Sequence, residues 1–272
     1  MNSPTVSIIM STYNDALYIG EAIESVLSQS FTDWEFIVVN DCSTDDSEEI
    51  INNYCNRDSR FIYIRNQKNK GQAVSLNTCI KLAKGRFIAV MDSDDIWSDT
   101  DKLKKQVRFL EENPSYGFVG CWSYIVENDK RITPLKYPGT DKAIREYMLI
   151  ENCFMHDTIV MRKKLLEAVG GYTASLHAAH DYQLWLKLGT ISKMHIIEEY
   201  MLHYRKNPKG ITLQKYDQQL RETIAVIKQF KDFYPNYLKG LLLWNVRKYI
   251  PKNNNTITRL KTVIRNYLIK TN

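Results

Sequence analysis

Apolar strands that alternate with helices predict an α/β protein whose mostly parallel sheet is flanked by helices. Two observations support this fold class. Four apolar runs in the first hundred residues have the length and composition of buried strands, and a helical pattern follows each of the first three. The chain of 272 residues is also long enough for one such domain with an appended helical piece.

The first half of the chain repeats the order strand, polar loop, helix. Strands are predicted at Val6–Met10, Trp34–Val39, Phe61–Ile64 and Phe87–Met91. Between them, helices are predicted around 17–27, around 50–54 and at Gln72–Ala83. Gly85 is the expected C-cap of the last of these helices.

The second half continues the alternation less regularly. Strands are expected at Tyr116–Val126, Phe154–Arg162 and Ile197–Arg205, and helices at Asp141–Ile150 and Tyr182–Leu188. From Leu213 onward the pattern is helical, with breaks at Pro235 and Pro251 that leave segments at 213–233, 237–249 and 256–269.

Positive charge is concentrated at the end of the chain. The net charge is +6, yet Asp232 is the last acidic residue and only basic charges follow it, so the preceding part is slightly acidic. This basic end is either a solvated face or a surface for an anionic bilayer, to which Leu241–Trp244 would add apolar contacts. No nucleic-acid partner is expected.

The five cysteines are widely spaced and form no metal-binding or redox motif, which is typical of reduced thiols in the cytoplasm. The first residues lack the basic and apolar regions of a signal peptide, and no segment has the roughly 20 apolar residues of a membrane span. We expect a cytoplasmic protein, free or bound peripherally at the inner face of the membrane.

Three carboxylates follow the fourth predicted strand directly, at Asp92, Asp94 and Asp95. Like charges this close repel one another unless a cation lies among them, which favours a hard divalent metal with oxygen ligands. A helix N-terminus is the alternative, because Asp95 or the 98–101 stretch could cap the next helix. Capping accounts for one or two of the acids, so we take the cluster as the candidate active centre.

Polar residues follow three of the predicted parallel strands: Ser11-Thr12-Tyr13, Asn40-Asp41 and Asp92-Ser93-Asp94. Each group alone could cap a helix. Ligands of such sheets bind at the carboxyl ends of the strands, so the three groups together predict one binding crevice. No glycine-rich phosphate loop follows the first strand, so a bound nucleotide would need the metal to neutralise its phosphates.

The ordered set VSIIMSTYN, FIVVNDCSTDDS, GQAVSLN, AKGRFIAVMDSDDIW and KLKKQVRFLEENP closely resembles glycosyltransferase family 2, over roughly residues 5 to 120. The resemblance implies the GT-A fold and an inverting transfer from a nucleotide sugar, a UDP-sugar foremost. It also implies Mn²⁺ or Mg²⁺ held by Asp92 and Asp94 of a D-x-D element that includes Ser93.

The same resemblance assigns further donor contacts. Thr12 and Tyr13 would contact the nucleoside, and Asp41 would accept a hydrogen bond from the base. Arg65 and Gly71 would line the same side of the crevice.

The stretch HAAHDYQLWL resembles the family's Glu-Asp motif, with Asp181 at the position of the catalytic base and His180 in place of the usual glutamate. Asp181 could also serve as the N-cap of the following helix. His156, His177 and His180 are expected to be structural or acceptor contacts rather than metal ligands.

The segment 197–205 resembles the closing strand of the family, and the loop 207–210 follows it. This loop could cover the donor pyrophosphate, with Arg205 or Lys209 meeting its charge, or it could be a plain surface loop.

The sequence thus predicts a GT-A domain over residues 1–212, with a nucleotide-sugar half at 1–120 and an acceptor half at 121–212, and a basic helical extension at 213–272. The predicted function is metal-dependent inverting transfer to a hydroxyl of a saccharide or lipid-linked saccharide, in bacterial surface polysaccharide or glycolipid synthesis. The alternatives are a nucleotidyltransferase and a non-catalytic sugar-nucleotide-binding subunit of a polysaccharide assembly complex.

Overall fold

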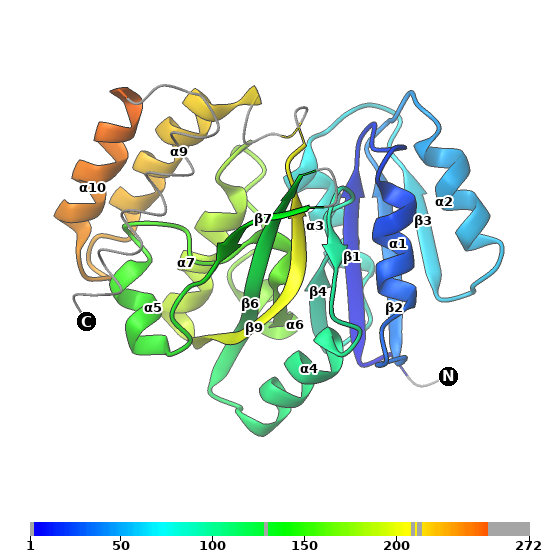
Figure 1. The fold of residues 1–272 in the computed structure, drawn as a ribbon, viewed down its shortest axis with the longest axis horizontal. Coiled ribbons are helices and arrows are strands. Elements are labelled where there is room, and N and C mark those ends of the chain that lie inside the picture. The colour runs from blue at the N-terminus through cyan, green and yellow to red at the C-terminus, as the bar shows by residue number, and fades with distance from the viewer. Residues whose placement is uncertain (1–2, 128–129, 208–209, 211–213, 250–272) are drawn as a thin grey trace.

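A computed structural model describes residues 3–127, 130–207, 210 and 214–249 of the chain. Its centre is one mixed sheet with the strand order β3-β2-β1-β4-β8-β6-β9-β5, and β7 pairs with β6 at one side (Figure 1). The strands are β1 Val6–Thr12, β2 Trp34–Asn40, β3 Phe61–Arg65, β4 Phe87–Val90, β5 Ile96–Trp97, β6 Tyr116–Glu127, β7 Lys130–Leu135, β8 Val160–Arg162 and β9 Lys193–Arg205.

Helices cover both faces of this sheet. They are α1 Ile19–Leu27, α2 Ser47–Cys55, α3 Gln72–Leu82, α4 Lys102–Glu112, α5 Asp141–Tyr147, α6 Lys163–Ala168, α7 His180–Ile191, α9 Tyr216–Gln229 and α10 Tyr237–Val246, with the 3₁₀ turns η1 His156–Thr158 and η2 Arg247–Tyr249. Apolar residues of α1, α2 and α4 pack in one core, and those of α3, α5, α7 and α9 pack in a second core. The expected α/β class is confirmed.

The first four strands are parallel, in the order β3-β2-β1-β4. The residues of β1, β2 and β4 are all buried, because helices cover both faces, and this explains their near-continuous apolar runs, whereas β3 at the edge of the sheet is only partly buried. The carboxyl ends of β1, β2 and β4 therefore lie side by side.

The second half departs from the predicted strand at Phe154–Arg162. Residues His156–Thr158 form the 3₁₀ turn η1, and only Val160–Arg162 pairs in the sheet, antiparallel to both β4 and β6. The polar residues at the start of this segment thus lie in a turn that points toward the ends of the parallel strands. Helix α5 is also shorter than predicted, because it ends at Tyr147.

Gly85 has a role other than the predicted C-cap. Helix α3 ends with Ala83 as its C-cap, and Gly85 lies against β1. A Cβ atom there would be 2.5 Å from the backbone nitrogen of Ser7 and 2.7 Å from the carbonyl carbon of Val6. The residue is glycine because two backbone segments meet there.

The helices of the C-terminal region pack on the sheet domain. Leu220, Ile227 and Phe230 of the α9 segment belong to the core that also contains α7, and α10 packs beside α9 at the end of the molecule opposite α2 and β3 (Figure 1). Gly240 of α10 makes a close approach to the backbone of Leu149. Among the described residues, no helix combines the length and hydrophobicity required to cross a bilayer. The helix predicted at 256–269 and the start of the one predicted at 213–233 lie outside the described residues.

Candidate active site

A cavity of about 600 Å³ opens where β1 and β4 end and extends to α7, α9 and α10. This volume is typical of small-molecule sites. Most of the predicted site residues line it: Thr12, Tyr13, Asp41, Gly71, Asp92, Ser93, Asp94, His156, His180 and Asp181. The predicted convergence of three polar strand ends in one crevice is therefore observed, together with the Asp181 segment from α7.

Asp41 follows β2 and is buried by the loop that precedes α3. Its carboxylate accepts hydrogen bonds from the Asn66 side chain at 2.7 Å, the Lys70 backbone at 2.9 Å and the Gly71 backbone at 2.7 Å. Gly71 has a φ of 88°, which favours glycine and turns this amide toward the carboxylate. A carboxylate has about four lone-pair sites, so Asp41 has one left for a ligand.

Asp15 connects the loop after β1 to the loop after β4. One of its carboxylate oxygens accepts from Ser93 Oγ at 2.6 Å, from Thr12 Oγ1 at 3.2 Å and from the Tyr13 backbone at 3.3 Å. Burial raises the pKa of Asp15, and these hydrogen bonds oppose the rise. The predicted donor contacts Thr12 and Ser93 thus use their hydroxyl groups to hold two loops together, whereas the Tyr13 side chain is half exposed at the cavity.

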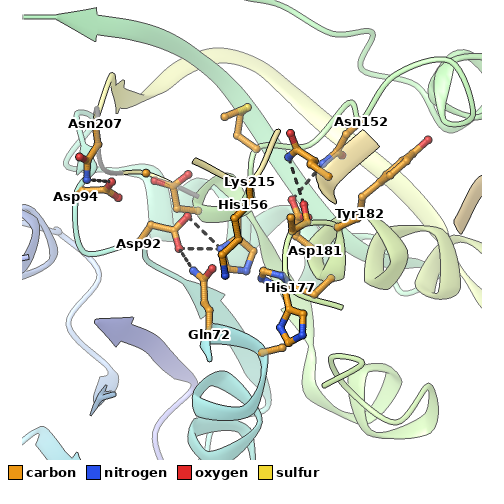
Figure 2. Close-up of a pocket in the computed structure, with 18 of the residues that line it drawn as sticks. Gln72, Asp92, Asp94, Asn152, His156, His177, Asp181, Tyr182, Asn207 and Lys215 are labelled. Carbon is orange, nitrogen blue, oxygen red and sulfur yellow. Dashed lines mark hydrogen bonds and ion pairs between the residues drawn. The ribbon is translucent and has the colours of Figure 1, made fainter. Parts of the chain in front are cut away.

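The D-x-D carboxylates have different partners. Asp92 accepts from Gln72 Nε2 at 3.1 Å and lies 2.8 Å from His156 Nδ1, and Asp94 accepts from Asn207 Nδ2 at 2.9 Å (Figure 2). Burial, with the Asp92 charge in addition, raises the pKa of Asp94 to about 6. Asn207 begins the loop predicted to cover the donor, so this loop contacts the D-x-D element directly.

Beneath the D-x-D loop lies a cluster of three carboxylates, Asp92, Asp95 and Asp157, with oxygens all within 4.8 Å of one another. Asp95 and Asp157 are almost completely buried. One oxygen of Asp95 and both of Asp157 have no hydrogen-bond donor among the described residues. Burial, then the charge of Asp92, raises the pKa of Asp157 to about 7, and burial and Asp157 raise that of Asp95.

Two arrangements satisfy these oxygens. A divalent cation would be coordinated by them, since oxygen donors without other partners fit such an ion. Alternatively, Asp95 and Asp157 share one proton, as closely spaced buried carboxyls do. Lys102 also lies near this cluster, and its buried ammonium has no hydrogen-bond partner among the residues that the structure describes. The acidic set fits a metal, and it includes Asp95 and Asp157 beside the predicted ligand Asp92.

His156 lies between Asp92 and the aromatic core. Its Nε2 is 2.9 Å from the Tyr172 hydroxyl, and its Nδ1 faces Asp92. Burial alone would lower the pKa of His156, but the Asp92 carboxylate raises it to about 9. His156 is thus a cation next to the D-x-D element at neutral pH.

Asp181 lies in the first turn of α7, one residue after the helix begins, so it is not the N-cap, which is Ala179. Its Oδ2 accepts from Asn152 Nδ2 at 3.2 Å, and no other side-chain bond to it is observed among the described residues (Figure 2). His180 is buried and its pKa is lowered to about 4 by burial, so it is neutral. Asp181 lines the cavity, and among the described residues it forms no ion pair.

Glu222 of α9 fixes the segment before α7. Its carboxylate accepts hydrogen bonds from the backbone of His177, Ala178 and Ala179. Burial would raise the pKa of Glu222, but these backbone donors hold it below its ordinary value. A helix outside the predicted catalytic domain therefore positions the start of α7.

Two predicted site residues lie outside the cavity. Arg65 pairs with Glu48 and does not line it. Arg205 pairs with Glu21 and packs over Tyr18, while its backbone nitrogen donates to Asp95 Oδ1 at 2.6 Å. The structure thus does not bring either guanidinium to the donor side. Lys209 lies outside the described residues.

Several cavity residues were not predicted as site residues from the sequence. Asp157 follows His156 directly, but its segment was read as a strand, which hid that both side chains turn inward. Asp15 lies just after the Ser11-Thr12-Tyr13 group, and nothing in the sequence signals its contact with Ser93. Asn152 is a single amide in an irregular segment, and nothing in the sequence signals its contact with Asp181.

Comparison with known proteins identifies the family. The model of glycosyl transferase family 2 matches residues 7–170, which is more than half of the chain. The chain belongs to glycosyl transferase family 2. This family 2 glycosyltransferase is an enzyme, and the family decides against the nucleotidyltransferase alternative. The resemblance described from the sequence is confirmed.

The relatives agree with this assignment. An uncharacterized glycosyltransferase of Methanocaldococcus jannaschii is 30% identical over 256 residues, covering 92% of this chain and 87% of that protein. The UDP-Glc:alpha-D-GlcNAc-diphosphoundecaprenol beta-1,3-glucosyltransferase WfaP of Escherichia coli is 32% identical over 226 residues, covering 80% and 84%.

Solved structures share the fold. The mannosyltransferase PcManGT from Pyrobaculum calidifontis, in complex with GDP-Man and Mn²⁺, superposes with a TM-score of 0.66 at 19% identity, covering 90% of this chain and 70% of that one. The GT-A fold expected from the resemblance is confirmed.

Proposed function

We propose that this family 2 glycosyltransferase transfers a sugar from a nucleotide sugar, a UDP-sugar foremost, to an acceptor hydroxyl with inversion. One observation carries the proposal: carboxylates from three distant stretches, Asp41, Asp94 and Asp181, line one cavity. Asp41 lies at the side where the base would bind, and Asp181 lies at the opposite side, on α7. The donor sugar would lie between them.

In this proposal Asp181 removes the proton of the acceptor hydroxyl as its oxygen attacks the anomeric carbon. A single displacement from the face opposite the leaving diphosphate inverts that carbon. Asp181 is suited to this role because Asn152 fixes one of its oxygens, while the other has no side-chain donor among the described residues. The neutral His180 adds no charge beside it.

The donor diphosphate needs positive charge, and a Mn²⁺ or Mg²⁺ ion would supply it by stabilising the leaving phosphate. Asp92 and Asp94 would hold the ion, with Asp95 and Asp157 as further oxygen donors behind Asp92. The cationic His156 orients Asp92, and Asn207 orients Asp94. Divalent metal binding is supported by the unsatisfied oxygens of the acidic cluster.

For the acceptor, we propose a saccharide on a lipid diphosphate, in the synthesis of a bacterial surface polysaccharide or glycolipid. The printed activity of the relative WfaP supports this acceptor class, because that enzyme glucosylates a sugar attached to diphosphoundecaprenol. The enzyme would then act in the cytoplasm at the inner membrane face, with its basic C-terminal residues near anionic lipids.

The test is the substitution Asp181→Asn in an assay with a donor selected by thermal shift from a panel of nucleotide sugars, with and without Mn²⁺. Loss of a general base lowers kcat by about 10²-fold to 10⁴-fold. Donor binding should not change. Asp232→Asn, which alters an exposed carboxylate outside the cavity, is the control and should keep full activity. Full transfer activity of Asp181→Asn would show that Asp181 is not the base.

A further inference from the structure

One cationic side chain that lines the cavity has no hydrogen-bond partner in the part of the chain that the structure describes. Arg247, at the start of η2 directly after α10, is only 3% exposed. Its three guanidinium nitrogens make no hydrogen bond with any described residue. A buried cation without hydrogen bonds or a counter-ion is strongly unfavourable, so the guanidinium is placed for an anion that none of the described residues supplies.

Next to Arg247 lies an aromatic ring, that of Trp244, which also carries a hydrogen-bond donor. Its guanidinium carbon lies 3.9 Å from the ring centre of Trp244, whose indole nitrogen also has no acceptor among the described residues. The Trp244 ring is 6.4 Å from that of Tyr182, the residue after Asp181. The carboxylate of Glu151 lines the same cavity but is not hydrogen-bonded to Arg247.

We propose that Arg247 binds a phosphate group attached to the acceptor sugar, with Trp244 holding the guanidinium in place. The inference rests on the proposed function, in which the donor diphosphate lies at Asp92 and Asp94, in the loop that follows β4. Arg247 lies on the helical side with Asp181, so its anion belongs to the acceptor. A planar guanidinium offers paired N–H donors that match two phosphate oxygens, and stacking on an aromatic ring fixes its plane.

The outer side of α10 indicates that this phosphate is part of a lipid. Leu238, Leu242 and Val246 are spaced four residues apart and are 76%, 65% and 46% exposed. Residues at this spacing share one helix face, which is apolar and flanked by the exposed cations Lys239 and Lys248. The segment that directs Arg247 into the cavity therefore presents a membrane-type surface outward, as a lipid diphosphate acceptor requires.

Binding of matched probes tests the proposal without turnover. The probes are decyl-diphosphate-linked N-acetylglucosamine, the uncharged decyl N-acetylglucosaminide, and inorganic pyrophosphate. Charge-assisted hydrogen bonds correspond to about tenfold to hundredfold in affinity. The intact protein should bind the diphosphate-linked sugar more tightly than the uncharged glycoside by this factor, and Arg247→Gln should remove the difference. Pyrophosphate should bind more weakly than the lipid-linked probe, because it lacks the sugar and the alkyl chain.

Two further variants separate binding from folding. Lys231→Gln removes an exposed cation outside the cavity and outside the proposed lipid-facing surface, and should leave all three affinities unchanged. Arg247→Lys keeps the charge but loses the paired donors and should give intermediate affinity. Without probe, Arg247→Gln should melt no lower than the intact protein, because an unpaired buried charge is removed, whereas an arginine that supports the fold would lower the melting temperature.

The outcomes distinguish this inference from the proposed function. Equal binding of the charged and uncharged glycosides by the intact protein, or no binding of either, overturns the role of Arg247. Equal weakening of both by Arg247→Gln also overturns it. Tighter binding of pyrophosphate than of the lipid-linked probe would instead assign the site to free phosphate. The proposed function has its own readout, nucleotide-sugar binding, which Arg247→Gln should leave unchanged.

Discussion

The substitution Asp157→Asn distinguishes the two explanations for the buried acidic cluster. Asparagine has nearly the shape of a protonated aspartate, so it preserves packing while removing the ionisable group. If Asp95 and Asp157 share a proton, the amide replaces the protonated partner. If the cluster coordinates a cation, the amide weakens the site by removing a charged ligand.

The magnitude follows from the pKa of Asp157, which burial first, and then the Asp92 charge, raises from 3.8 to about 7. His156 and Lys102 oppose this rise. The folded protein therefore keeps a proton that the unfolded chain loses between these values. Hence the free energy of unfolding of the metal-free protein falls as pH rises from about 4 to 7, by a total of about 4 kcal/mol for this difference in pKa. Asp157→Asn does not titrate, so its decline should be smaller and it should be the more stable protein at pH 8.

Urea unfolding between pH 4 and 8 measures this difference, first without metal and then with Mn²⁺. At about a hundred times its dissociation constant, an ion bound only to the folded state adds about 2.7 kcal/mol. If Asp157 coordinates the ion, Mn²⁺ should stabilise the intact protein at pH 8 and should stabilise Asp157→Asn much less. Equal stabilisation would exclude Asp157 as a ligand of the ion. The same pH dependence in both metal-free proteins would refute the raised pKa of Asp157.

Two further predictions concern stability. The Asp92 charge raises the pKa of His156 to about 9, so the stability gained from this ion pair is lost as the histidine deprotonates between pH 6.5 and 9. In metal-free His156→Gln, the free energy of unfolding should therefore not decline over this pH range. A decline of unchanged slope in urea titrations would contradict this prediction. Gly85→Ala should destabilise the fold by about 1–3 kcal/mol, because the new Cβ would lie 2.5 Å from the backbone nitrogen of Ser7. Gly20→Ala is the control, since a Cβ there would lie 3.9 Å from the nearest atom, and it should be neutral or stabilising. Equal effects of the two alanines in urea unfolding would show that the close contact at Gly85 relaxes.

The parallel half of the fold was predictable because its strands are buried on both faces. Strands such as Trp34–Asn40 contain a continuous apolar run, here Phe36–Val39, so they are visible without knowledge of their partners. The strand predicted at 154–162 was wrong because this segment has no long apolar run of that kind. Its core residues Phe154, Ile159 and Met161 lie on either side of a 3₁₀ turn, and a short apolar run has no periodicity that separates an irregular segment from a strand.

The site residues were predictable where chain order alone brings them together. Parallel strands end at the same edge, so Thr12, Asp41 and Asp94 had to converge once the sheet was predicted. Arg65 follows a parallel strand too, but its side chain turns to Glu48 of α2. The strand end predicts where a residue lies, whereas the direction of a long side chain depends on the nearest opposite charge.

The acids of the cavity differ in how completely the chain satisfies them, and this difference separates structural from reactive roles. Asp41 and Asp15 each accept three hydrogen bonds and thereby hold loops in place. Within the described part of the chain, Asp157 accepts none, and Asp181 accepts a single one from a side chain. Because an unsatisfied buried acceptor costs about 1–3 kcal/mol, such groups indicate an external proton, cation or ligand. The same reasoning applies with the opposite charge to Arg247, whose donors lack acceptors at the other side of the cavity. The hydrogen-bond partners that satisfy some of these charged side chains come from distant segments. No local sequence pattern therefore separates the structural side chains from the reactive ones.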